Sequence, residues 1–137
     1  MLHDPHMNAE PILVASGLTY LFPFYIAMQK DKMYDAYTYL FLTFTTVGFH
    51  STRNEHLFFL DCLAILNFLV RSYYISLEAT QYTRYIYFLS VSYSLVSYFV
   101  GRKYKIMSFN PDWNTQMFWH SLMHISTSYS AYKLISE

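Results

Sequence analysis

Two histidines near the end of the chain, His120 and His124, are the residues best placed to do chemistry. They lie in a run from 113 to 132 that contains no charged residue, where a buried imidazole is costly unless something binds it. Side chains at positions i and i+4 share one helix face, so both rings can converge on one metal ion. With six histidines in 137 residues, such a pair arises by chance in about one chain in four, so the spacing alone is a weak signal.

Long uncharged runs recur along the chain and predict the helices that must position these histidines. Charged residues make up 13% of the sequence, against roughly 25% in ordinary soluble proteins. A helix needs about 17 to 25 residues to cross the hydrocarbon core of a bilayer. We therefore expect an all-α fold, a polytopic transmembrane bundle forming a single domain over 1–137. The expected helices span about 11–29, 34–51, 56–77, 83–101 and 113–134. A soluble helical bundle is the alternative, but it would need charged helix faces that these runs hardly provide.

Alternating helix directions bring further polar residues to the same membrane face. His50 ends the second expected helix, Asp61 lies about two turns into the third, and the two histidines lie two and three turns into the fifth. Three neutral imidazoles with one open position form the ligand set of a catalytic zinc, which can lower the pKa of bound water to about 7. The sequence therefore predicts a zinc site at His50, His120 and His124, with metal-bound water as the nucleophile.

Asp61 and Thr46 are the predicted catalytic residues beside this site. Asp61 can act as the general base or can orient a metal-ligating imidazole. Thr46 lies four residues before His50, on the same helix face, and can offer its hydroxyl to a developing oxyanion. Hydrogen bonding between helices is the structural alternative for each of these buried groups. His56 is an alternative ligand, although an interfacial histidine is the simpler interpretation.

At these residues the chain resembles the superfamily of seven-helix membrane hydrolases that joins the alkaline ceramidases, the adiponectin-type receptors and their relatives. That family carries Ser-x3-His at the end of helix two, Asp early in helix three and His-x3-His in the last helix. The matching text here is Thr46-Val-Gly-Phe-His50, Asp61 in HLFFLDCLAIL, and His120-Ser-Leu-Met-His124. The step from His50 to Asp61 is similar to the ceramidase branch. The chain departs from the pattern in Thr46, which replaces serine, and in having five expected helices instead of seven.

The resemblance implies that the three histidines hold zinc and that the chain hydrolyses a lipid amide, such as ceramide, to a fatty acid and an amine. It also implies a multi-pass protein of an internal membrane such as the endoplasmic reticulum or Golgi. The alternative is a non-enzymatic membrane scaffold or interaction protein that retains a structural or vestigial zinc site. A metal or proton transporter fits less well, because the polar cluster is confined to one face.

Charge and cysteine content narrow the remaining possibilities. Net charge is zero, and the densest basic cluster is Arg102, Lys103 and Lys105, so no nucleic-acid partner is expected. The single cysteine, Cys62, cannot form an internal disulfide. His3 and His6 fall in a polar segment without Lys or Arg, which is unlike a cleaved signal peptide. Basic residues divide equally between the two faces, so membrane orientation and oligomeric state stay open.

Overall fold

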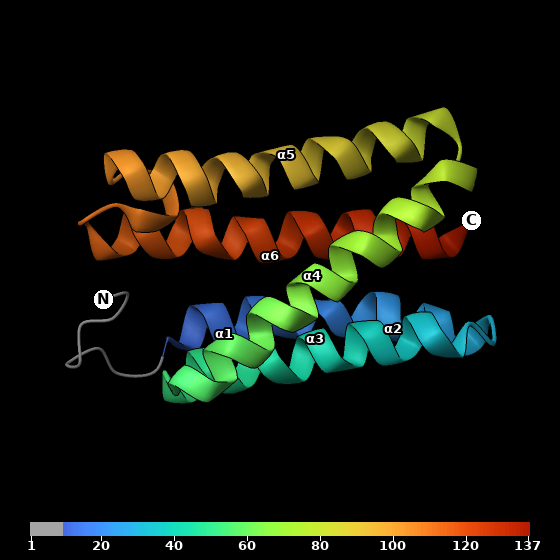
Figure 1. Ribbon diagram of the computed structural model, residues 1–137, viewed down its shortest axis with the longest axis horizontal. Coiled ribbons are helices and arrows are strands. Elements are labelled where there is room, and N and C mark those ends of the chain that lie inside the picture. Colours follow the sequence, from blue (N-terminus) through green and yellow to red (C-terminus); the bar gives the residue numbers. More distant parts are fainter. Residues whose placement is uncertain (1–9) are drawn as a thin grey trace.

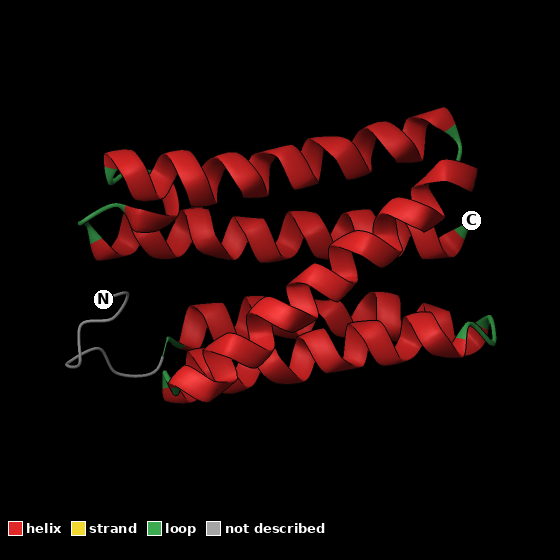
Figure 2. Cartoon of the chain, in the orientation of Figure 1, coloured by secondary structure: helices red, strands yellow, loops and turns green. Residues whose placement is uncertain are grey.

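A computed structural model of the chain describes residues 10–137, and these are almost entirely helical (Figure 2). No strand occurs within this range, so the predicted all-helical class is confirmed. Because α1, η1 and α2 follow one another without a gap, the described chain forms five rods. The elements are α1 (Pro11–Gly17), η1 (Leu18–Tyr20), α2 (Leu21–Gln29), α3 (Met33–Thr52), α4 (Glu55–Glu78), α5 (Gln81–Tyr104), η2 (Met107–Phe109) and α6 (Trp113–Ser136).

The first rod changes to a 3₁₀ turn just before Pro23 and then continues as α2. Proline has no backbone N–H, so the carbonyl of Thr19, four residues earlier, loses its helical donor. The Ser128 hydroxyl of α6 donates to that carbonyl at 2.7 Å. A neighbouring helix thus satisfies the freed group, and the first rod is tied to α6 at this level.

Polar residues at the connections cap the last three rods, α4, α5 and α6. Asn54 caps α4 by accepting from the backbone N–H groups of His56 and Leu57, at 2.9 and 3.3 Å. Thr80 caps α5, and Asp112 caps α6 by accepting from the Thr115 N–H at 2.8 Å. Each cap satisfies a donor that the first turn leaves unpaired. The last helix therefore begins at Trp113, as its Asn-Pro-Asp sequence predicts.

The five rods pack into a bundle in which α4 crosses from the α3 side to the α5 side (Figure 1). α3 packs against α1, α2 and α4, while α6 packs against α5 and against the first rod. The core between these rods is formed by buried side chains of α2, α3, α4 and α6 and by Tyr20 of η1. With alternating directions, the starts of α1, α4 and α6 and the end of α3 share one end of the bundle (Figure 1).

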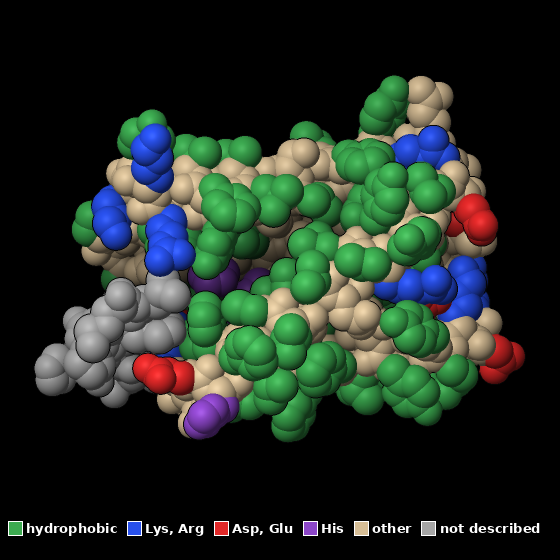
Figure 3. All heavy atoms as spheres, in the orientation of Figure 1, with side chains coloured by type: hydrophobic (Ala, Val, Ile, Leu, Met, Phe, Trp, Pro, Cys, Tyr) green, Lys and Arg blue, Asp and Glu red, His purple; other side chains and the backbone are tan. Residues whose placement is uncertain are grey.

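Large apolar side chains cover much of the outside of the bundle. Phe22, Phe44 and Leu89 are each more than two-thirds exposed, at 69%, 68% and 75%. In Figure 3 hydrophobic side chains dominate the middle of the visible face, whereas charged side chains gather toward the two ends of the long axis. Such a distribution is typical of a surface whose central zone does not face water.

Two rods, Pro11–Gln29 and Glu55–Glu78, are long and apolar enough to cross a membrane by length and composition. The core helix of a soluble protein or a signal sequence can meet the same test, so this is weak support for membrane association. The other three rods fall short of it. Five membrane crossings within a single transmembrane domain therefore stay a prediction.

Candidate metal centre

Three histidine side chains meet at the end of the bundle where α3 ends and α6 begins. One possible ligand atom from each of His50, His120 and His124 lies within 4.8 Å of those of the other two. The ring centroids are 5.0 Å apart for His50 and His120, 5.3 Å for His50 and His124, and 5.0 Å for His120 and His124. Three imidazole nitrogens this close can bind one metal ion together. The predicted ligand set is thus assembled in space.

Helix geometry explains why these residues come together. His120 and His124 are one turn apart on α6, so their rings project from the same helix face. His50 lies in the last turn of α3 and approaches from a rod that is not adjacent to α6 in sequence. His50 and His124 are only 1% and 8% exposed, and His120 is half-buried. Figure 3 shows histidine side chains on the floor of a hollow between α6 and α4.

His50 is held by a buried carboxylate from the start of the first rod. Oε2 of Glu10 lies 2.6 Å from Nδ1 of His50, and the Arg53 guanidinium also contacts this oxygen. The backbone N–H of Glu10 donates to the His50 carbonyl at 2.9 Å. An ionised carboxylate can only accept, so beside an ionised Glu10 it is Nδ1 of His50 that would carry the hydrogen. The nitrogen left for a metal is Nε2.

His124 is held by a hydroxyl of the same rod. Oγ of Ser16 lies 2.9 Å from Nδ1 of His124 and 3.1 Å from the Leu13 carbonyl oxygen. A hydroxyl has one hydrogen, so a Ser16 that donates to Leu13 accepts from Nδ1–H of His124. This arrangement again leaves Nε2 free to bind a metal. Two of the three imidazoles therefore have partners on their outer nitrogens, as metal-ligating histidines usually do.

Asp61 of α4 lies near this cluster and is held by two threonines of α3. Its Oδ1 accepts hydrogen bonds from the hydroxyls of Thr46, at 2.7 Å, and Thr45, at 2.9 Å. Asp61 is 7% exposed, and both threonines are fully buried. Thr46 therefore donates its hydrogen to Asp61 in this structure. The oxyanion role expected for Thr46 would require that hydrogen bond to be exchanged.

Among the described residues, the one remaining histidine, His56, does not join the cluster. His56 is exposed at the start of α4, where only its backbone N–H takes part in capping. His3 and His6 lie outside the described residues.

Glu10, Ser16 and Thr45 were missed by the sequence analysis. Helix alternation alone could have identified Glu10, because it places the start of the first rod at the same end as His50. Ser16 and Thr45 gave no such signal, since buried hydroxyls are common in helices of this kind.

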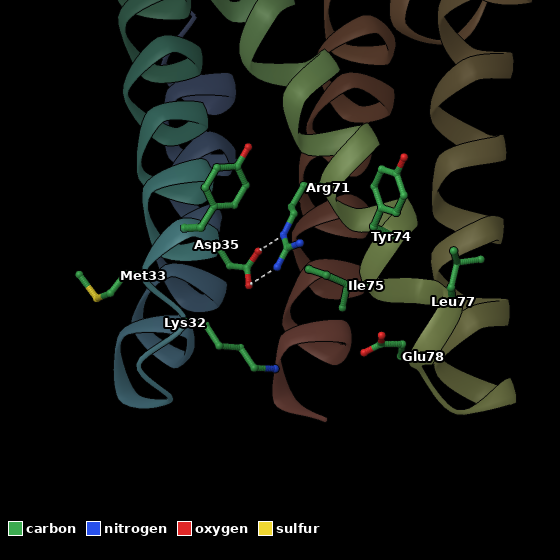
Figure 4. A pocket seen from close by; sticks show the side chains of 9 residues that line it. Lys32, Met33, Asp35, Arg71, Tyr74, Ile75, Leu77 and Glu78 are labelled. Atoms are coloured by element: carbon green, nitrogen blue, oxygen red, sulfur yellow. Dashed lines mark hydrogen bonds and ion pairs between the residues drawn. The ribbon is translucent and has the colours of Figure 1, made fainter.

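Two pockets lie away from the histidines. One, of about 590 Å³, lies between the start of α3 and the end of α4, at the opposite end of the bundle (Figure 4). Its wall contains the ion pair between Asp35 and Arg71, with separations of 2.5 and 3.2 Å. The Arg71 guanidinium also lies 5.3 Å from the Tyr34 ring centre. A second, of about 350 Å³, is an apolar surface groove on the first rod.

Comparison with known proteins identifies no family for this chain. No protein-family model, curated protein or solved structure matches the chain. The assignment of the site therefore depends on its own geometry. That geometry defines a helical protein with a buried group of three histidines that could hold a metal ion.

Proposed function

We propose that this protein is a zinc-dependent intramembrane hydrolase that cleaves a lipid amide of the ceramide type. The observation that carries the proposal is the meeting of three imidazoles from two distant rods, within 4.8 Å, beside a buried carboxylate. Inside an apolar bundle, so many polar groups at one place are expensive unless they serve a site.

The donor set fits zinc. Imidazole nitrogen is a preferred zinc ligand, and three protein ligands with one open position are the usual arrangement at catalytic zinc. The outer nitrogens of His50 and His124 have hydrogen-bond partners, so both rings are oriented before any metal arrives. When bound, zinc would supply Lewis-acid polarisation of a carbonyl and an activated water near neutral pH.

Asp61 would act as the proton acceptor for the attacking water and then as the donor to the leaving amine. The Thr45 and Thr46 hydroxyls fix its carboxylate and leave the second oxygen, Oδ2, available for that exchange. Its burial excludes bulk water, which would otherwise compete for the same hydrogen bonds. Thr46 is thus a positioning residue for the base in this proposal.

The surroundings of the site support a lipid as the proposed substrate. The hollow over the histidines opens on a face rich in hydrophobic side chains (Figure 3), which suits an acyl chain better than a water-soluble substrate. The amide bond and an internal membrane such as the endoplasmic reticulum or Golgi are proposed from the resemblance of the motifs to alkaline ceramidases.

A second candidate function is a membrane scaffold with a structural zinc site. It is favoured by the position of the two pockets described above, neither of which is lined by a histidine. The two functions separate at Asp61, because a structural zinc needs the three imidazoles but no general base.

Metal content and turnover test the proposal together. Mass spectrometry on detergent-purified protein should find about one zinc per chain, which His120→Ala/His124→Ala should lose because two of three ligands are gone. His56→Ala is the matched control and should keep the metal, since His56 lies outside the cluster. Absence of zinc from the wild-type protein would refute the proposal.

Asp61→Asn separates the enzyme from the scaffold. This variant should retain zinc but lose ceramide hydrolysis by at least about 100-fold, because an amide cannot accept the proton. Product release is measured with a set of ceramides differing in acyl chain. Wild-type turnover in Asp61→Asn would remove the assigned base, and zinc without turnover in either form would favour the scaffold.

A further inference from the structure

Glu10 joins the candidate metal centre through both its side chain and its main chain. Its carboxylate is 2.6 Å from Nδ1 of His50, and its backbone N–H donates to the His50 carbonyl. Glu10 is only 1% exposed, and a glutamate is rarely buried to this extent unless it is paired. We propose that Glu10 is the residue that positions His50 in the metal site: it holds His50 in the Nδ1–H form and aims Nε2 at His120 and His124. The metal part of this inference rests on the proposed function.

The geometry distinguishes Glu10 from Asp61, the acid that the sequence analysis considered for this task. The hydrogen bonds of Asp61 run to the threonines of α3, whereas the carboxylate in contact with an imidazole is Glu10. Glu10 and Asp61 therefore have different roles in this proposal. Asp61 remains available to exchange a proton with substrate or water, and Glu10 orients a ligand.

Arg53 offsets the free-energy cost of burying the Glu10 side chain. A buried carboxylate without a cation is strongly destabilising, and a guanidinium can neutralise it while leaving it ionised. Arg53 contacts Oε2 of Glu10, the oxygen that also faces His50. Arg53 lies three residues after His50 in the sequence, at the end of α3. Arg53 thus places a positive charge at the carboxylate oxygen that faces Nδ1 of His50.

The same contacts give the site a preformed geometry. In the neutral ring one nitrogen carries hydrogen and the other has the lone pair, so fixing the first also fixes the second. Without Glu10, His50 could present either nitrogen and could rotate about its side-chain bonds. The metal would then have to select one arrangement, and its affinity would fall.

A first test needs no metal. Nitrogen-15 NMR of histidine-labelled, metal-free full-length protein in detergent micelles reports which ring nitrogen of His50 is protonated, with His50→Gln used to assign the signal. The wild-type protein should show the Nδ1–H form, and Glu10→Gln should shift the signal toward a mixture of forms. A wild-type His50 protonated at Nε2 overturns the inference, even if the Gln variant fails to fold.

A second test measures the metal site. Zinc affinity is determined by chelator competition for wild type, Glu10→Gln and Glu55→Gln, the last being an exposed glutamate at the same end of the bundle. Glu10→Gln should bind zinc about 10- to 100-fold more weakly and shift the absorption spectrum of the cobalt-substituted protein, whereas Glu55→Gln should match wild type.

The outcomes separate the two proposals. If wild type binds zinc and folded Glu10→Gln matches it in affinity and cobalt spectrum, the inference falls while the proposed function stands. If wild type binds no zinc but its His50 is in the Nδ1–H form that Glu10→Gln loses, the proposed function falls and the orienting role of Glu10 stands.

Discussion

Asp61 illustrates how single residues at this site depend on their immediate neighbours. Its carboxylate is buried in an apolar bundle, and within the described part of the chain its hydrogen bonds come from the Thr45 and Thr46 hydroxyls. Hydrogen bonds to a charged group contribute about 1.5–3 kcal/mol each, more than bonds between neutral groups. The two threonine hydroxyls therefore contribute more to stability than the small apolar area of these side chains suggests.

Thr46→Val should reveal this dependence. The substitution keeps the shape but removes the stronger donor to Asp61, so the free energy of unfolding in detergent should fall by about 1.5–3 kcal/mol. If the proposed hydrolase activity is present, ceramide turnover should fall with it, because the proposed base, Asp61, loses its fixed orientation. Thr46→Ser keeps the hydroxyl and is the control, which should stay closer to wild type in both measurements. Equal values for the Val and Ser variants would show that the hydroxyl is unimportant.

At the scale of elements, the close approach of α1 to α3 brings Glu10 and Ser16 within reach of the histidines. Gly17 lies at this contact. A Cβ at position 17 would be 2.9 Å from Cγ2 of Thr46, a β-branched side chain already held by Asp61. The absence of a side chain at Gly17 therefore sets the spacing of the two rods, and the metal centre depends on that spacing.

Gly17→Ala should move α1 away from α3 and lower the free energy of unfolding by about 1–3 kcal/mol, as overpacking of a tight contact does. Zinc affinity should fall as well, because Glu10 and Ser16 move with α1. Gly48→Ala is the matched control within a helix. Its Cβ would meet only the flexible end of Leu57, at 3.3 Å, so stability should stay near wild type or rise. Similar unfolding curves for the two alanine variants would contradict this account.

At the scale of the whole molecule, the distribution of side chains on the surface and the position of the histidine cluster both fit a membrane environment. Charged groups lie toward the ends of the long axis, and exposed aromatic and aliphatic side chains lie between them (Figure 3). A bilayer would cover that middle zone, and the histidine cluster would then lie near one membrane face. The Asp35–Arg71 pair would lie toward the other, where the exposed part of Arg71 can reach the headgroups.

Membrane integration makes a direct prediction for the full chain. If the bundle is integrated in a membrane, the protein expressed in cells should remain in the membrane pellet after an alkaline carbonate wash and should enter solution only with detergent, because lipid would shield its exposed apolar side chains. A known peripheral protein in the same preparation should be released by the wash. Release of this chain without detergent would refute the membrane bundle and, with it, the lipid substrate.

The sequence alone determined the helical class and the three histidines of the candidate metal centre. Long uncharged runs and capping residues such as Asp112 are local signals, so the helices of the structure begin and end close to the predicted positions. The i, i+4 spacing of His120 and His124 is likewise local. Alternation of helix directions then sufficed to bring His50 to the same end, because short connections leave a helix little choice of direction.

Tertiary structure decided which polar groups touch. Whether Asp61 or Glu10 contacts an imidazole depends on the rotation of each rod about its axis and on the closeness of α1 to α3, and neither is encoded in spacing along the chain. These quantities are set by packing at Gly17 and by contacts such as that of Ser128 with the Thr19 carbonyl, which join residues far apart in sequence. Local patterns therefore fix which residues can reach the site, and long-range packing fixes what each one does there.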